Sequence, residues 1–227
     1  MRLLVIAAHP DDEVLGCGGT IARLASTGDV HIAILGEGVT ARSMDRTNAD
    51  QPKIDNLYSH ARQVSKLLGA KSISFDGFPD NRFDTIPLLD VVKCVERIID
   101  EFSPSIVFTH HPGDLNIDHQ VTFRSVLTAT RPAGAPGDVS DIYSFEIPSS
   151  TEWSFQMLSP QFKPTIFYDV TDTIDLKIQG MESYRSETRP FPHPRSPQAL
   201  RAIARRWGSV IGVPYAEPFE LVRSIRL

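Results

Sequence analysis

The sequence predicts an α/β fold, a Rossmann-like three-layer sandwich with a mostly parallel central sheet. Short apolar runs alternate with helical patterns through the first 130 residues. This alternation is typical of βαβ units, in which a helix connects neighbouring parallel strands. The chain has 227 residues, of which 41% are hydrophobic and 22% charged, and its composition does not shift along its length. We expect a single domain over residues 1–227, with a core over 1–132 and substrate-pocket loops and C-terminal elements over 133–227.

The expected elements follow one another in a regular order. Four strands are short apolar runs, at residues 3–8, 30–38, 71–75 and 104–112. Four helices, in which apolar residues recur at helical spacing, follow these strands in turn at residues 13–28, 57–69, 86–102 and 118–132. Gly28 and Pro132 are expected to end the first and the fourth helix. Later elements, separated by Pro- and Gly-rich loops, are strands at 142–147 and 165–170 and helices at 171–186 and 197–211.

The charge and the composition argue against several classes of protein. The net charge of −5 gives no basic surface for nucleic acid. The apolar start at residues 3–8 is too short to span a bilayer and lacks the pattern of a signal peptide. The two cysteines, Cys17 and Cys94, are too few for a disulfide framework and are not spaced as a metal pair. We expect a cytoplasmic protein without an integral membrane segment, and a homo-oligomer stays open.

Imidazoles and carboxylates gather just past the first and the fourth expected strand, in AHPDDE (8–13) and THHPGDLNIDH (109–119). In an open parallel sheet, ligands bind at the carboxyl ends of the strands where the strand order reverses, and these two strands commonly flank that point. The side chains expected to face one another there are His9, Asp11, Asp12, His110, His111, Asp114, Asn116, Asp118 and His119. Two histidines and a carboxylate are typical ligands of a catalytic Zn²⁺ or Fe²⁺, with one position left for water.

Two simpler interpretations compete with a metal site. A lone His-Pro-Asp sequence is more often a capped turn than a ligand set, so the first motif alone leaves the choice even. The run GCGG (16–19) suggests a nucleotide-binding loop, but Ile21 stands where the third glycine of G-x-G-x-x-G belongs, and acids occupy the place of a phosphate. The matching cluster after the fourth strand favours the metal site.

With these motifs the sequence resembles the PIG-L/LmbE-like metal-dependent N-deacetylases. The resemblance rests on HPDDE (9–13) together with the Asp-His pair at 118–119. It extends to GFPDNRFD (77–84) and FPHPRS (191–196), and it covers nearly the whole chain. It implies hydrolysis of a linear amide bond, namely removal of the acetyl group from an N-acetylhexosamine of the N-acetylglucosamine type, in a small molecule or a glycoconjugate.

The resemblance also assigns roles to individual residues. His9, Asp12 and His119 would bind one metal ion, Zn²⁺ or alternatively Fe²⁺. Asp11 would be the general base that accepts a proton from the attacking water, whose pKa a metal lowers towards ~7. We expect Asp118 to orient an imidazole or the neighbouring loop.

Asn116 departs from the family's pattern, which usually has a histidine two residues before the Asp-His pair. An amide can donate a hydrogen bond to an oxyanion but cannot deliver a proton. The proton for the leaving amine then comes either from Asp11 or from one of His110, His111 and His193. We favour Asp11 as both base and acid, with Asn116 holding the oxyanion.

The candidates for substrate binding lie in loops around the expected crevice: Arg42, Arg46, Asp80, Asn81, Arg82, Asp84, His110, His193 and Arg195. A solvated loop charge explains Arg42 and Arg46 about equally well, and an Asx-turn is the structural explanation of Asp80 and Asn81.

Two other functions stay open. One is an amidase of a larger amide such as a thiol conjugate, which would release a larger acid than acetate. The other is a carbohydrate-binding protein that has lost catalysis, which the substitution at Asn116 makes conceivable. The intact set of His9, Asp11, Asp12 and His119 argues against this second alternative.

Overall fold

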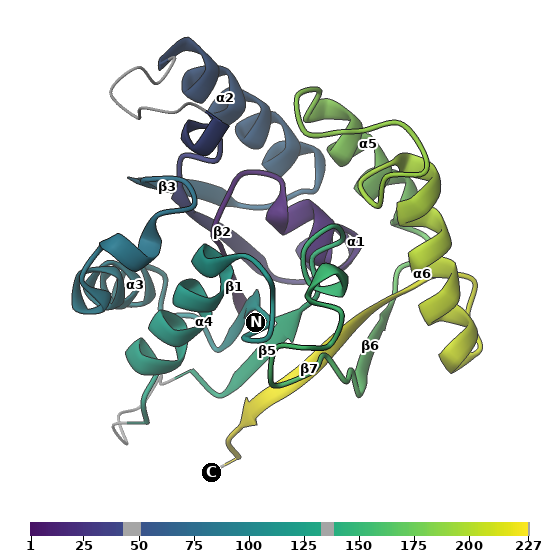
Figure 1. Ribbon diagram of the computed structural model, residues 1–227. Helices are drawn as coiled ribbons and strands as arrows, with labels where there is room; N and C mark the ends of the chain where they lie inside the picture. The colour runs from purple at the N-terminus through teal and green to yellow at the C-terminus, as the bar shows by residue number, and fades with distance from the viewer. Residues whose placement is uncertain (43–50, 133–138, 227) are drawn as a thin grey trace.

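A seven-stranded sheet forms the centre of the protein in the computed structural model, which describes residues 1–42, 51–132 and 139–226 (Figure 1). Its strands are β1 (Arg2–Ala7), β2 (Asp29–Gly36), β3 (Ser72–Phe78), β4 (Ile106–His110), β5 (Asp141–Phe145), β6 (Ile166–Asp169) and β7 (Ala216–Ser224). The strand order is β3-β2-β1-β4-β5-β7-β6, and the first five strands of that order are parallel. β7 is antiparallel to both β5 and β6. This mostly parallel sheet confirms the predicted fold class.

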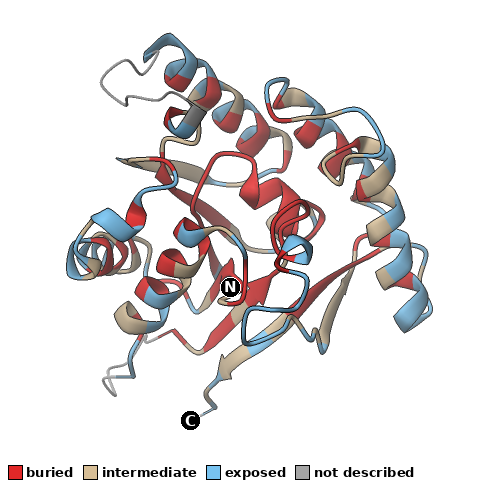
Figure 2. Ribbon diagram, in the orientation of Figure 1, coloured by how far each residue is buried: buried red, intermediate tan, exposed pale blue. Residues whose placement is uncertain are grey.

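Helices cover both faces of the sheet (Figure 1). Among the described residues they are α1 (Asp12–Ala25), α2 (Gln51–Leu67), α3 (Leu88–Phe102), α4 (Ile117–Ala129), α5 (Ile174–Ser183) and α6 (Pro197–Ile211). Side chains alternate along β1: Leu3 and Val5 share a core with α1, α2, α5 and α6, whereas Leu4 and Ile6 share a second core with α3 and α4. Figure 2 shows the central strands and α1 buried between these layers. The three-layer sandwich is therefore confirmed.

The strand order reverses beside β1. The chain passes from β1 through α1 to β2 on one side, whereas β4 pairs with β1 on the other. The ends of β1 and β4 therefore flank a topological switch point, where ligands bind in sheets of this kind. A hydrogen bond of 2.8 Å from the Ala8 N–H to Nε2 of His110 joins the two strand ends. The two motifs predicted to meet lie at this point.

The glycine run of α1 allows close packing. A Cβ atom at Gly16 would lie 2.4 Å from the ring of Phe145, and one at Gly19 would lie 2.9 Å from Val170. Real Cβ atoms do not approach other atoms so closely, so only glycine lets α1 lie this near β5 and the residue that follows β6. The run GCGG therefore has a packing role here.

The helix is interrupted in the same place. Cys17 has non-helical backbone angles, which frees backbone groups on both sides of it. Glu217 of β7 accepts the N–H groups of Gly19 and Thr20 at 3.0 and 2.7 Å. Lys177 of α5 donates to the Leu15 carbonyl at 2.9 Å and to Glu217 at 2.6 Å. A buried ion pair thus satisfies the freed groups, as buried polar atoms require.

β7 was not expected from the sequence. Its segment contains Pro218, which lacks an N–H and is normally confined to edge strands, yet β7 lies between β5 and β6. Strands from both sides of residue 132 join one sheet, and we propose on this ground that residues 1–227 form one domain. None of the helices in the described residues is sufficiently long and apolar to cross a membrane.

Candidate active site

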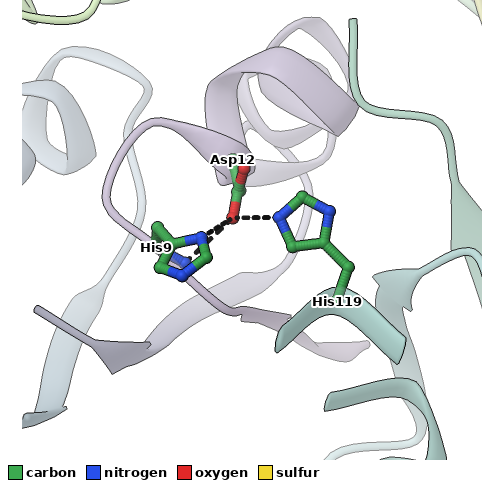
Figure 3. A group of neighbouring side chains, drawn as sticks. All are labelled: His9, Asp12 and His119. Carbon is green, nitrogen blue, oxygen red and sulfur yellow. Dashed lines mark hydrogen bonds and ion pairs between the residues drawn. The ribbon is translucent and has the colours of Figure 1, made fainter. Parts of the chain in front are cut away.

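Two imidazoles, those of His9 and His119, converge on one carboxylate oxygen of Asp12 (Figure 3). Oδ2 of Asp12 lies 3.3 Å from Nδ1 of His9 and 3.3 Å from Nε2 of His119. It also accepts a hydrogen bond of 2.9 Å from the backbone N–H of His9. Asp12 begins α1 and His119 lies in the first turn of α4. All three residues are buried, so the predicted metal ligands form one compact group.

This group fits a tetrahedral metal ion. Zn²⁺ binds nitrogen and oxygen at about 2.0–2.1 Å, which places two ligand atoms of a tetrahedral site about 3.3 Å apart. The distances from Asp12 to both imidazoles have this value. Nε2 of His119 is buried without a hydrogen-bond partner in the described residues. Buried polar atoms are rarely left in this way, so a ligand belongs beside it.

The charges of Asp12 and His119 shift each other's pKa. Burial alone would raise the pKa of Asp12, but the neighbouring imidazole of His119 holds it well below its ordinary value. Burial alone would lower the pKa of His119, but the carboxylates of Asp12 and Asp114 raise it to about 9. The carboxylate is therefore ready to bind a cation, whereas His119 must first lose a proton.

Asp118 contacts the ring of His9 and the loop that follows β3. Its Oδ2 lies 2.8 Å from Nε2 of His9, which leaves Nδ1 of that ring on the side of Asp12. The same carboxylate accepts the N–H groups of Asn81 and Phe83 at 2.6 and 2.9 Å. Asp118 orients His9 in this way and does not reach the cavity.

Asp114 contacts the His119 ring on the side away from Asp12. Its Oδ1 lies 3.0 Å from Nδ1 of His119, so Nε2 of that ring points toward Asp12. The Asp114 carboxylate accepts hydrogen bonds from the hydroxyls of Ser150 and Thr151. Asp114 is expected at the crevice from the sequence, but its role is not, and no sequence signal points to the two hydroxyls, because they follow β5 in a loop that carries no motif.

Asp11 directly precedes α1 and has an unusual backbone conformation. Its φ of 107° lies in the left-handed region that few non-glycine residues adopt. Glu13 supports this turn by accepting the Asp11 N–H at 3.0 Å and the hydroxyl of Tyr184 at 2.5 Å. Burial raises the pKa of Asp11 well above its ordinary value, although the positive charge of Arg195 acts in the opposite direction. A carboxylate with a raised pKa is suited to accept a proton near neutral pH.

Arg195 brings the C-terminal part of the chain to the site. Its Nη1 donates to Oδ2 of Asp11 at 2.8 Å, and its Nε donates to the Ser149 hydroxyl at 2.7 Å. Glu187 lies 3.6 Å from the same guanidinium. Ser149 and Glu187 were missed by the sequence analysis, since only the tertiary fold brings them to Asp11.

Asn116 caps a helix and also lines the cavity. Its Oδ1 accepts the Asp118 N–H at 2.8 Å and so caps the start of α4. The side chain also lines the cavity beside His119. With the oxygen engaged in the cap, the amide nitrogen Nδ2 is the atom that can donate to a ligand.

A cavity of about 230 Å³ opens over this group. Of the residues singled out in the sequence, those that line it are His9, Asp11, Asp12, Asp80, Asn81, Asn116, His119 and Arg195. Other lining residues are Pro10, Gly38, Ala41, Ser149, Ser150 and Glu187. Among the described side chains, carboxylates dominate its polar wall, and the guanidinium of Arg195 there is paired with them.

Several predicted substrate contacts are not in the cavity wall. Arg82 and Asp84 are exposed outside it, and His193 accepts the Arg195 N–H at 3.1 Å instead. His110 is fully buried, with its ring stacked on His119. A substrate contact of His110 is therefore wrong for this structure, because the last residue of β4 packs inside the sheet.

The two arginines after β2 cannot be placed in the same way. Only the backbone of Arg42 is described, in a short 3₁₀ turn (Thr40–Arg42). Arg46 lies outside the described residues.

Comparisons with known proteins agree with this geometry. A family model described as PIG-L, GlcNAc-PI de-N-acetylase, matches residues 4–130. The chain is 29% identical to the uncharacterized deacetylase YaiS of Escherichia coli K12, over 81% of this chain and 90% of that protein. It is 27% identical to the diacetylchitobiose deacetylase of Thermococcus kodakarensis, over 100% of this chain and 85% of that protein.

A solved structure has the same fold. The N,N'-diacetylchitobiose deacetylase from Pyrococcus horikoshii superposes with a TM-score of 0.77 at 24% identity, over 98% of this chain and 84% of that chain.

Proposed function

Since this chain belongs to the PIG-L family of de-N-acetylases, we propose that it hydrolyses the acetamide of an N-acetylhexosamine at the cavity above Asp12. The observation that carries the proposal is the group of His9, Asp12 and His119, in which an oxygen of Asp12 lies 3.3 Å from a nitrogen of each imidazole, with the carboxylate of Asp11 lining the same cavity. We propose Zn²⁺ as the resident ion because two imidazoles and one carboxylate suit it. A cytoplasmic location accords with two unpaired cysteines, Cys17 and Cys94.

A few side chains share the steps of the proposed reaction. The metal supplies a Lewis acid that activates water and polarises the amide carbonyl. Asp11 accepts the proton of the attacking water and returns it to the amide nitrogen when the carbon–nitrogen bond breaks. The Arg195 guanidinium holds the Asp11 carboxylate in place through a bond of 2.8 Å. Nδ2 of Asn116 donates to the developing oxyanion.

The size and charge of the cavity favour a small neutral substrate. Its volume of about 230 Å³ lies below the ~300–1,000 Å³ of pockets for drug-sized ligands, so we expect it to enclose one sugar unit. The carboxylates of Asp80 and Glu187 in its wall would repel an anionic acyl group. This supports acetyl over the larger amide considered above.

A panel of substrates tests the proposal. N-acetylglucosamine glycosides should release acetate and a free amine in equal amounts, whereas N-succinyl analogues and amide-linked thiol conjugates should react far more slowly. Preferential release of a larger acid would establish the amidase instead. Binding of sugars without release of any acid would establish a carbohydrate-binding protein.

Two variants of Asn116 separate its role as a helix cap from its proposed role as a hydrogen-bond donor to the oxyanion. Asn116→Ser keeps an oxygen for the cap and removes the amide donor, so we expect a kcat about 10–10³-fold lower at nearly unchanged stability. Asn116→Ala should lose the same activity and also about 1 kcal/mol of stability. Steady-state kinetics and thermal unfolding measure the two effects. Wild-type kcat in both variants would show that Asn116 is only a helix cap and does not hold the oxyanion.

Metal affinity should depend on pH. In the metal-free protein the pKa of His119 is about 9, so the ring is protonated at neutral pH and a metal must displace that proton. Affinity should therefore increase about tenfold per pH unit for each displaced proton, and should level off above pH ~9. Competition with a chelator of known pH dependence, between about pH 6.5 and about pH 9.5, measures this. A flat affinity would contradict the assignment of His119 as a ligand.

A further inference from the structure

His110 contacts two of the proposed ligands and the residue that precedes the third. Its ring stacks on that of His119, with centroids 3.9 Å apart and 15° between the planes. Its Nε2 lies 3.5 Å from Oδ2 of Asp12. The same nitrogen accepts the backbone N–H of Ala8 at 2.8 Å, and Ala8 directly precedes His9. One buried imidazole thus joins the end of β1 to the end of β4.

These contacts determine the state of the ring. A backbone N–H can only donate, so Nε2 of His110 must accept and carries no proton. The ring is therefore neutral, with its proton on Nδ1. A neutral flat ring can stack closely on His119 without adding positive charge beside a metal ion.

We propose that His110 is a positioning residue of the metal centre, which sets the distance between the ligands after β1 and the ligand in α4. The proposal rests on the metal-dependent function proposed above. His110 does not line the cavity, so it acts through the ligands and touches no substrate. Asp114 and Asp118 hold single rings, whereas His110 connects the two halves of the ligand set.

Two variants divide the interactions of His110. His110→Phe keeps a flat ring against His119 but leaves the Ala8 N–H buried without an acceptor. His110→Gln provides an acceptor near the position of Nε2 but removes the stacked ring. Removal of groups that hold metal ligands typically weakens metal affinity about 10–100-fold. We expect losses in this range for both variants, with part of the loss recovered in His110→Gln.

The neighbouring histidine provides a matched control. His111 is equally buried, but its Nε2 lies 2.8 Å from the Pro160 carbonyl and its Nδ1 3.0 Å from Glu220. His111→Phe and His111→Gln should therefore lower the unfolding temperature while metal affinity stays at the wild-type value. The metal affinities of His110 and His111 variants with similar unfolding temperatures are then compared. A loss of affinity in the His110 variant alone separates a positioning role from general destabilisation.

The experiment is a competition titration of the metal-free proteins with a chromophoric zinc chelator, together with the visible spectrum of each Co²⁺-substituted protein. We expect weaker Zn²⁺ binding and an altered Co²⁺ spectrum in the His110 variants alone. Wild-type affinity and spectrum in folded His110→Gln would overturn the proposal, and so would equal losses in the His111 variants. If His110→Phe does not fold, His110→Gln decides. The stoichiometry of Zn²⁺ in the wild type tests the ligand set separately, so the failure of one proposal is distinguishable from the failure of the other.

Discussion

Replacing Asp11 with asparagine should lower kcat by about 10²–10⁴-fold while the bound metal stays in place. The substitution keeps the size of the side chain and its hydrogen bond to Arg195, but the amide cannot accept the proton of the attacking water. The metal should stay because the proposed ligands are His9, Asp12 and His119, and Asp11 is not among them. Steady-state kinetics on an N-acetylhexosamine substrate and metal analysis of the same preparation measure both quantities.

The matched control for Asp11 is Asp90→Asn. Asp90 lies exposed in the first turn of α3, outside the cavity, so the same chemical change there should alter neither activity nor metal content. Near-wild-type kcat in Asp11→Asn would exclude Asp11 as the base.

Replacing His119 with alanine should remove both metal and activity. The substitution deletes one of three proposed ligands and leaves the Asp12 carboxylate with a single imidazole ligand partner, so affinity should fall by well over the ~10–100-fold expected for a residue that only supports a ligand. The metal content of the purified variant should be close to zero, with kcat at the level of the metal-depleted wild type.

His60→Ala is the control for this loss. His60 lies in α2, outside the cavity and the ligand group, so its variant should keep wild-type metal content and activity. A His119→Ala protein that is folded and carries the wild-type amount of metal would refute the ligand assignment.

The predicted metal motifs needed little tertiary information. Each lies directly after a strand, and in a parallel sheet the order of strands alone brings the ends of β1 and β4 together. Asp118 could be assigned an orienting role because it stands one residue before a proposed ligand. The roles of the site residues themselves stay predictions until the variants are measured.

The remainder of the site depends on contacts that no local pattern specifies. Ser149 and Ser150 follow β5 and Glu187 follows α5, and only the tertiary fold brings these three residues to the cavity. β7 is hidden in the sequence by Pro218. His110 is a related case: it lies at the carboxyl end of an expected strand, where a substrate contact was expected, but as the last residue of β4 it packs inward. Burial of a polar residue at a strand end is decided by the strands on either side.

Acetate release by metal-depleted and metal-reloaded protein tests the central claim most directly. The wild type is stripped with a chelator, then titrated with Zn²⁺ while hydrolysis of an N-acetylglucosamine glycoside is followed by acetate and amine together. Activity should be absent without metal, should rise in proportion to added Zn²⁺, and should reach its maximum at about one ion per chain, as a single three-ligand site requires. Full activity in the stripped protein, or no acetate release at any metal content from a panel of N-acetylhexosamines, would contradict a metal-dependent N-deacetylase.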